Sequence, residues 1–373
     1  MNYDFTEAEL LFAGEVEKAA AQMPLAPASG TFFSNAEIKA ALGLLAKTPY
    51  LAVGLDKSAG MGAVIHMASM ESLASLAPSM ALCVEMSTRV FGRLLAAHGS
   101  DVAKEKVLKP LLAGNLVGAV ALSEGAMNVE NDPFSTQGLE QGDGFSVTGA
   151  KNWVVNAPAA DVIAVAGRVG DKVAFFLVPA GAPGLLVEAP ATTMGYEAAP
   201  LSGLSLENCA VPRDMILGPF DAKTILAEAR ELENLVLLGL ALGAMKSAFG
   251  QAKAHAKSHK SGGKPIIAFQ EVGFKLSEML TMLQASELLA FRAAWLAEKG
   301  DKATADVLLC AKVFVAECAE KVTGEALRIL SGAGWTGTGP AQGAFRNAKW
   351  SQIAGTSTEI ARVKIGDSAL GYK

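Results

Sequence analysis

The order in which the hydrophobic pattern changes along the chain is the feature that most constrains its fold. Residues 1–117 and 221–373 show helical spacing, whereas residues 118–220 contain short apolar runs separated by glycine-rich turns, such as Val162–Ala166 and Val173–Val178. The sequence therefore predicts an α+β protein with an N-terminal α-helical domain (1–117), a middle antiparallel β domain (118–220) and a C-terminal α-helical domain (221–373). Because the strands do not alternate with helices, this order excludes βαβ folds.

The chain is rich in apolar residues and poor in charge. Of its 373 residues, 51% are hydrophobic and 18% are charged, against roughly 25% charged in a typical globular protein. We expect the excess apolar surface to be covered by other subunits. The net charge of −5 and the lack of a long Lys/Arg cluster argue against a nucleic-acid or anionic-membrane partner.

Three features favour a cytoplasmic location. The N-terminal residues Met1–Asp4 lack the basic and apolar regions of a signal peptide. The longest apolar run, Leu235–Met245, is shorter than the roughly 20 residues of a membrane span and is typical of a buried helix. The four cysteines are scattered, which is typical of a reduced protein.

Two motifs that suggest a bound ligand are better explained as ordinary secondary structure. Gly332–Gly337 matches Gly-x-Gly-x-x-Gly, but it follows a predicted helix rather than a strand, so a turn is favoured over a dinucleotide site. His255 and His259 lie four residues apart, as metal ligands on a helix do, but lysines surround them and no carboxylate lies between them. We predict a polar helix face there, and no metal site.

Glu233 is the carboxylate with the most unusual setting. Val236, Leu237 and Leu240 follow it at helical spacing, so it begins an apolar helix face. A shielded carboxylate suits proton abstraction near neutral pH. The alternative is a helix-terminal glutamate paired with Arg230, three residues earlier, and the spacing alone favours this pairing.

Several segments, in order, resemble the acyl-CoA dehydrogenase family over nearly the whole chain. They are Gly99–Gly114, Val120–Glu124, Gly149–Asn156, Gly263–Gln270, Ser331–Gly334 and Arg346–Arg362. The resemblance implies an N-terminal helical domain, a middle β domain and a C-terminal four-helix bundle, with FAD as cofactor. It also implies α,β-dehydrogenation of an acyl-CoA thioester to the 2-enoyl-CoA, with an electron-transfer flavoprotein as partner and a tetrameric assembly.

The resemblance also bears on the catalytic base. Most family members carry a glutamate in a C-terminal Tyr-Glu-Gly-Thr segment, and this chain has Ala354–Gly355 at the Tyr-Glu pair. The isovaleryl- and long-chain-type members hold the base on the first long helix after the β domain, where Glu233 lies. Glu233 thereby becomes the predicted base, with Glu359 second.

The remaining site residues are assigned by resemblance. The predicted cofactor residues are Leu122, Ser123, Trp153, Val154, Val155, His259, Gln270, Arg328, Gly332, Ser357 and Glu359. The predicted substrate residues are Val129, Asn234, Gly355 and Thr356. Departures from the family pattern include Gly125, Val155, His259, Asn234 and Arg328. They leave a second possibility, a degraded-site subunit of a heteromeric acyl-CoA dehydrogenase complex.

Overall fold

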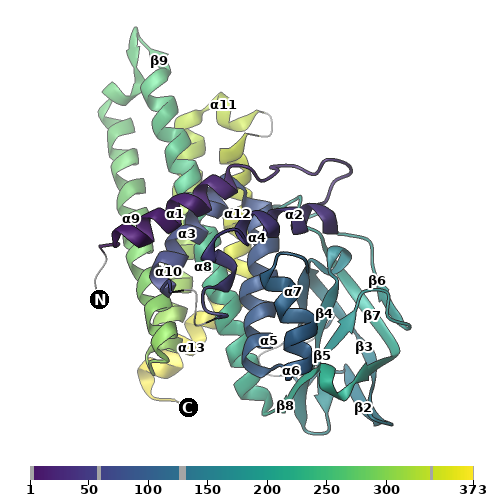
Figure 1. The fold of residues 1–373 in the computed structure, drawn as a ribbon. Coiled ribbons are helices and arrows are strands. Elements are labelled where there is room, and N and C mark those ends of the chain that lie inside the picture. The colour runs from purple at the N-terminus through teal and green to yellow at the C-terminus, as the bar shows by residue number, and fades with distance from the viewer. Residues whose placement is uncertain (1–3, 57–59, 126–131, 337–338, 373) are drawn as a thin grey trace.

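The predicted order of helices, strands and helices is confirmed in a computed structural model, which describes residues 4–56, 60–125, 132–336 and 339–372 (Figure 1). The N-terminal part holds α1 to α7, with the bounds α1 Glu7–Ala20, α2 Asn35–Leu45, α3 Ala63–Leu76, α4 Pro78–Glu85, α5 Arg93–His98, α6 Asp101–Ala103 and α7 Lys109–Leu112. Thr6 and Ser34 begin α1 and α2 with capping boxes, because each accepts a backbone hydrogen bond three residues on. Two π-helical segments, η3 (Met86–Gly92) and η4 (Lys104–Leu108), continue α4 into α5 and α6 into α7.

The middle part is a twisted sheet. Its strands are β1 Gly118–Ala121, β2 Gln137–Gln141, β3 Gly144–Val155, β4 Val162–Val169, β5 Lys172–Pro179, β6 Leu185–Val187, β7 Leu201–Pro212 and β8 Ile216–Phe220. The sheet order is β6-β7-β3-β2-β4-β5-β8, and β1 pairs with β4. Most pairs are antiparallel as predicted, but β1 runs parallel to β4, and β2 makes a single parallel pair with β4. Parallel pairing follows from a long connection, which local alternation of residues does not reveal.

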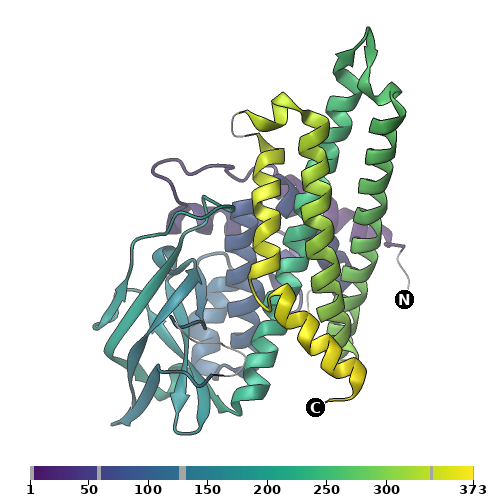
Figure 2. The same cartoon turned by 180° about the vertical axis from the view of Figure 1, so that it is seen from behind.

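The C-terminal part is the predicted four-helix bundle, formed by α8 (Ala222–Ser258), α9 (Gln270–Lys299), α10 (Thr304–Leu330) and α12 (Pro340–Ile353) (Figure 2). Short helices α11 (Gly332–Trp335) and α13 (Thr358–Leu370) flank α12. A hairpin of β9 (Lys260–Ser261) and β10 (Lys264–Pro265) forms the tip between α8 and α9 (Figure 1). Among the described residues, α8 alone is long and apolar enough to cross a membrane, and 67% of its apolar window is buried inside the protein.

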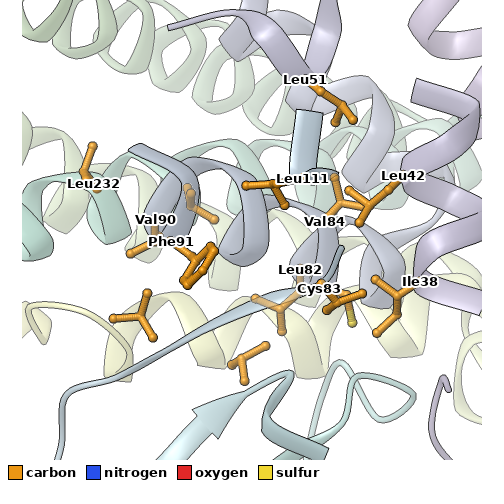
Figure 3. Packing of buried hydrophobic residues seen from close by; sticks show 14 of the residues in the cluster. Ile38, Leu42, Leu51, Leu82, Cys83, Val84, Val90, Phe91, Leu111 and Leu232 are labelled. Atoms are coloured by element: carbon orange, nitrogen blue, oxygen red, sulfur yellow. The ribbon is translucent and has the colours of Figure 1, made fainter. Parts of the chain in front are cut away.

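The core joins the helical domain to the first strand. Phe91 and Leu111 pack with Leu232 of α8 in one cluster of buried side chains (Figure 3). A Cβ at Gly118 would overlap the Phe91 ring, so glycine lets β1 begin directly against η3. This contact lies at the first residue of β1, and Ser123 follows two residues after the strand ends.

Candidate active site

A cleft of about 490 Å³ lies where the three parts of the chain meet. The sheet contributes residues from β1 and β3, the helical domain contributes η3, and the C-terminal part contributes α8, α12 and the loop into α13. Six predicted cofactor or catalytic residues line it, together with the predicted substrate residue Gly355: Leu122, Ser123, Trp153, Val155, Glu233 and Ser357. The structure therefore gathers these residues from positions more than 200 apart in sequence.

The walls of the cleft carry exposed apolar groups. Trp153 is 67% exposed and Ile353 is 70% exposed, although large apolar side chains are usually buried. Trp350 also lines the cleft, and its indole N–H is buried without a hydrogen-bond partner among the described residues. Apolar and aromatic walls with a few polar groups are typical of a small-molecule binding site.

Glu233 makes the predicted pair with Arg230 and also lies in the wall of the cleft. Its side chain lines the cleft and is only 15% exposed. Arg230, one turn earlier on α8, donates from Nη1 to Oε2 of Glu233 at 2.5 Å. The carboxylate is thus presented to the cleft by a guanidinium that also lines it. Of the described lining residues, Glu233 is the only carboxylate.

The loop after α12 cannot carry a side chain at position 355. Gly355 has φ +64°, and a Cβ there would lie 2.5 Å from Oδ1 of Asn234. Asn234 is held in place because it accepts from the Thr356 backbone N–H at 3.0 Å and donates to the Thr356 hydroxyl at 3.1 Å. A side chain that could act as a base at position 355 is therefore disfavoured by geometry, as well as absent from the sequence.

The same two bonds place Asn234 and Thr356, both predicted as substrate residues, in the interior behind the cleft wall. Val154 is likewise buried, on the opposite face of β3 from Val155. Glu359 lies in the first turn of α13. The pKa of its carboxyl is lowered, mainly because the backbone N–H of the same residue donates a hydrogen bond to it. Val129 lies outside the described residues.

Lys312 is a buried residue of the site that sequence reasoning missed. From α10 it donates to the carbonyls of Ser351 and Ala354, the latter at 3.1 Å, and so holds the loop that contains Gly355. Burial lowers the pKa of Lys312 to about 8, while the negative charge of Glu233 opposes that shift. A lysine among Ala311, Val315 and other buried α10 residues was the available signal.

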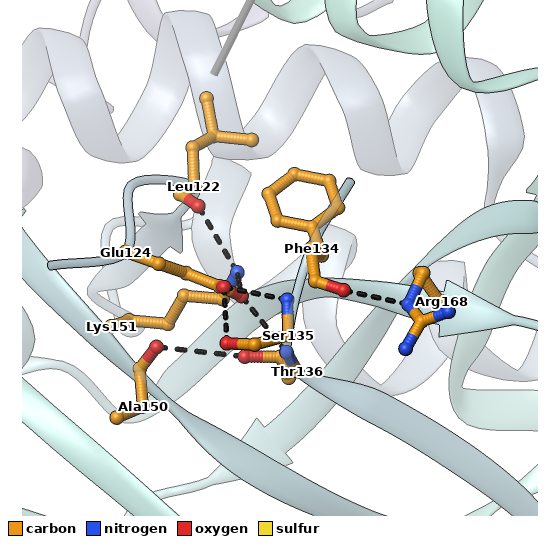
Figure 4. A network of polar contacts seen from close by, with 8 residues as sticks. All are labelled: Leu122, Glu124, Phe134, Ser135, Thr136, Ala150, Lys151 and Arg168. Carbon is orange, nitrogen blue, oxygen red and sulfur yellow. Dashed lines mark hydrogen bonds and ion pairs between the residues drawn. The ribbon is translucent and has the colours of Figure 1, made fainter. Parts of the chain in front are cut away.

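A buried ion pair supports the strand end that enters the cleft, and sequence reasoning missed its role too. Lys151 donates to Glu124 at 2.8 Å, and Ser135 and Thr136 also donate to this carboxylate (Figure 4). Burial alone would raise the pKa of Glu124, but the Lys151 and Ser135 hydrogen bonds and the Lys151 charge lower it to about 2. The hydrogen bonds from Ser135 and Thr136 to Glu124 join the two ends of the segment 124–136, and Lys151 neutralises the carboxylate.

The other predicted cofactor residues lie at the opposite end of the bundle. His259 caps the C-terminus of α8, Gln270 begins α9, and Arg328 and Gly332 lie where α10 meets α11. Along the α8 axis, His259 is about 40 Å from Glu233, at 1.5 Å per residue. Arg328 pairs there with Glu325 at 2.8 Å, and none of these four residues lines the cleft.

The family models for the acyl-CoA dehydrogenase middle domain and C-terminal domain match residues 119–209 and 225–370. Together they cover more than half of the chain. The chain belongs to the acyl-CoA dehydrogenase family. Its fold and its relatives are those of acyl-CoA dehydrogenase-type oxidoreductases.

Among the relatives of this chain, a benzylmalonyl-CoA dehydrogenase of Aromatoleum aromaticum is 31% identical over 77% of each chain. The human mitochondrial short-chain specific acyl-CoA dehydrogenase is 27% identical over 98% of this chain and 88% of its own. The solved butyryl-CoA dehydrogenase of Megasphaera elsdenii superposes with a TM-score of 0.90 at 23% identity, over 99% of this chain and all of the other. That likeness supports the fold.

Proposed function

We propose that this protein catalyses the FAD-dependent α,β-dehydrogenation of an acyl-CoA thioester to the 2-enoyl-CoA, with Glu233 as the base. The observation that carries the proposal is that Glu233 is the one carboxylate on the described wall of the cleft, while Gly355 leaves no room for a base on the facing loop. Several relatives, by their names, act on CoA thioesters of short or branched acids.

The residues of the cleft fit the ring system of FAD. Trp153 and Ile353 offer exposed apolar surface, and the Ser123 hydroxyl lies beside them in the lining. When bound there, FAD supplies the acceptor for the hydride that leaves the substrate β-carbon. A related structure of similar fold has been solved with FAD, that of PigA, at 20% identity.

The chain's own residues handle the proton. The Glu233 carboxylate takes the proton from the substrate α-carbon, and the electron pair of that C–H bond becomes the second bond between the α- and β-carbons. Arg230 holds the carboxylate at the cleft wall, so the base is positioned before substrate arrives. We propose that the thioester end of the substrate lies against the Gly355 backbone, because this residue lines the cleft and carries no side chain.

We further propose that each FAD lies across two copies of the chain in a tetramer. His259, Gln270, Arg328 and Gly332 are predicted cofactor residues, yet they lie far from the cleft of their own chain. Exposed apolar side chains on the bundle, Phe274 and Leu288 of α9 and Phe314 of α10, offer surface for subunit contact. An electron-transfer flavoprotein as acceptor and a cytoplasmic location remain predictions.

A degraded-site subunit is the second candidate, and one observation favours it. Val155, which lines the cleft, offers no hydrogen-bond donor to a flavin from its side chain. That candidate predicts weak FAD retention by the pure protein and recovery on co-expression with a related chain.

The absorbance spectrum of the pure protein, with its native mass, separates the two. The proposal predicts a flavin spectrum with one FAD per chain, which bleaches when butyryl-CoA is added without oxygen. A colourless protein that binds no added FAD would overturn it. A flavin spectrum that no acyl-CoA from butyryl- to palmitoyl-CoA bleaches would also overturn it, whereas FAD retained only on co-expression with a related chain would favour the degraded-site subunit.

A further inference from the structure

A second cavity, of about 280 Å³, lies on another face of α8 and shares no lining residue with the cleft. Leu232, Leu235 and Val236 of α8 face it, whereas Arg230 and Glu233 face the cleft. Its other walls come from α3, η3, α5 and α9. The volume is just below the roughly 300–1,000 Å³ of ligand pockets, which limits an occupant to a small molecule.

One of the two arginines in this cavity has an ion-pair partner, although its Nε makes no hydrogen bond to a described residue. Arg89 donates to the carbonyls of Tyr50 and Val53, and its Nε lies 3.6 Å from the Glu85 carboxylate. The Tyr50 hydroxyl donates to the same carboxylate at 2.7 Å. Arg89 and Glu85 therefore balance each other in charge.

The second arginine has no such partner. No hydrogen bond or ion pair reaches Arg93 from the residues that the structure describes, and its Nε is buried. Its guanidinium passes so close to Gly54 that a Cβ there would overlap it, so glycine leaves the room that Arg93 occupies. Burial and the charge of Arg89 lower the pKa of Arg93 to about 10, while Glu85, Glu298 and Glu231 oppose the shift. Arg93 thus brings a positive charge that no contact with a described side chain neutralises.

His66 adds a second unused group. It is 3% exposed, lines the cavity, and its Nε2 has no hydrogen-bond partner among the described residues. Burial first, and then the charges of Arg89 and Arg93, lower its pKa well below 6.5, so the ring is neutral. A neutral imidazole can donate one hydrogen bond without adding charge. Buried polar groups in folded proteins are normally paired, so two orphans in one cavity indicate an absent ligand.

We propose that this cavity binds a small aliphatic monocarboxylate. Its carboxylate pairs with the Arg93 guanidinium and accepts from His66, and its short chain packs against Met67, Met70 and Leu235. Arg93 makes no ion pair with a described residue, and Glu298, the one carboxylate in the described lining, already accepts from the Ala63 backbone N–H, so a single negative charge suits the site better than two. The apolar walls favour an alkyl acid over phosphate, which is hydrophilic on all sides. An outer depression shares Gly54, Arg93 and Glu298 with the cavity and opens it to the surface.

Thermal unfolding and calorimetric titration of the full-length protein with sodium butyrate test the proposal. Butyrate should raise the unfolding temperature saturably, whereas 1-butanol and sodium phosphate at equal concentration should not. Arg93→Met, which keeps the bulk and removes the charge, should weaken butyrate binding about 10- to 100-fold, the loss of one charge-assisted hydrogen bond.

The matched control is Arg230→Met, which removes the arginine of the cleft instead. The effect of butyrate should persist in that variant, because binding in the cleft would depend on Arg230. Should Arg93→Met fail to fold, His66→Phe serves as the second variant, with the same expected weakening. No effect of butyrate on the wild type, or equal binding by wild type and Arg93→Met, overturns the proposal.

Discussion

The two ends of α8 differ in how much of a binding site this chain forms around them. At the N-terminal end, residues from all three parts of the chain converge on a walled cleft, and buried contacts such as Lys151–Glu124 and Asn234–Thr356 fix its edges. At the C-terminal end, His259 and Arg328 are exposed and lie outside the cleft, and Arg328 lines an open depression with Glu325 and Trp335. The difference is what we expect if one chain supplies the reacting groups of a site and, as proposed above, a second copy supplies the remaining cofactor contacts.

The largest expected effect is on the rate of flavin reduction, from a change in the cleft at the N-terminal end of α8. Glu233→Gln should lower the rate of flavin reduction by acyl-CoA about 10²- to 10⁴-fold, because the amide cannot accept the α-proton. FAD content should stay unchanged. The control is Glu231→Gln, two residues earlier and outside the cleft lining, which should reduce at the wild-type rate. Stopped-flow absorbance measures both, and undiminished reduction in Glu233→Gln with full FAD would remove Glu233 as the base.

The next effect contrasts the ion pairs of the two ends. Lys151→Met should lower the free energy of unfolding by about 3–5 kcal/mol, because it leaves the Glu124 carboxylate buried and unpaired. Arg328→Met breaks the exposed pair with Glu325 at the far end and should cost at most about 1 kcal/mol. Urea unfolding of both variants measures the difference. Equal losses would contradict the contrast between the two ends.

The buried pair of Lys151 and Glu124 should also make the stability of the protein depend on pH in acid. The folded-state pKa of Glu124 is about 2, below its ordinary value of 4.5, so the stability that this group contributes is complete above pH 4.5. That contribution is lost as the pH falls from 4.5 towards 2. Glu124→Gln should remove this part of the pH dependence of unfolding, measured by urea titration between pH 2 and 6. Parallel curves for variant and wild type would contradict the assignment.

The smallest expected effect is on FAD retention, from a change near the C-terminal end of α8. Arg328→Ala should weaken FAD retention about tenfold or less, because it removes at most one charge-assisted contact at an exposed position. The rate of flavin reduction in the FAD that remains should be unchanged. Equilibrium dialysis gives the first quantity and stopped-flow absorbance the second. A slower reduction step in Arg328→Ala would place this residue in the chemistry and break the division between the ends.

The sequence predicts more of the fold than of the site. The change from helix to strand near Gly118 and back near Ala222 follows from local hydrophobic period, and the structure confirms it. Glu233 could be singled out because its helical neighbours are apolar. Its pairing with Arg230, which local spacing favours, is confirmed, whereas its role as the base stays a prediction.

Other features of the site depend on contacts between distant residues. Asn234 bonds Thr356 across 122 positions, and Lys312 reaches Ala354 across 42. No local pattern predicts either bond. The family resemblance assigns Asn234 and Thr356 to the substrate site, whereas the structure buries both side chains behind the cleft wall. The orphaned pair of Arg93 and His66 likewise emerges only when α3 and α5 pack together.

The most direct test of the account is complementation between two inactive variants. One variant carries Glu233→Gln, and the other loses FAD through combined changes at His259, Gln270 and Arg328. If each site joins the cleft of one copy to the far end of another, denaturing and refolding the two together should recover acyl-CoA oxidation that neither shows alone. No recovery in mixed oligomers, with wild-type chains regaining activity under the same treatment, would contradict a cofactor site shared between copies.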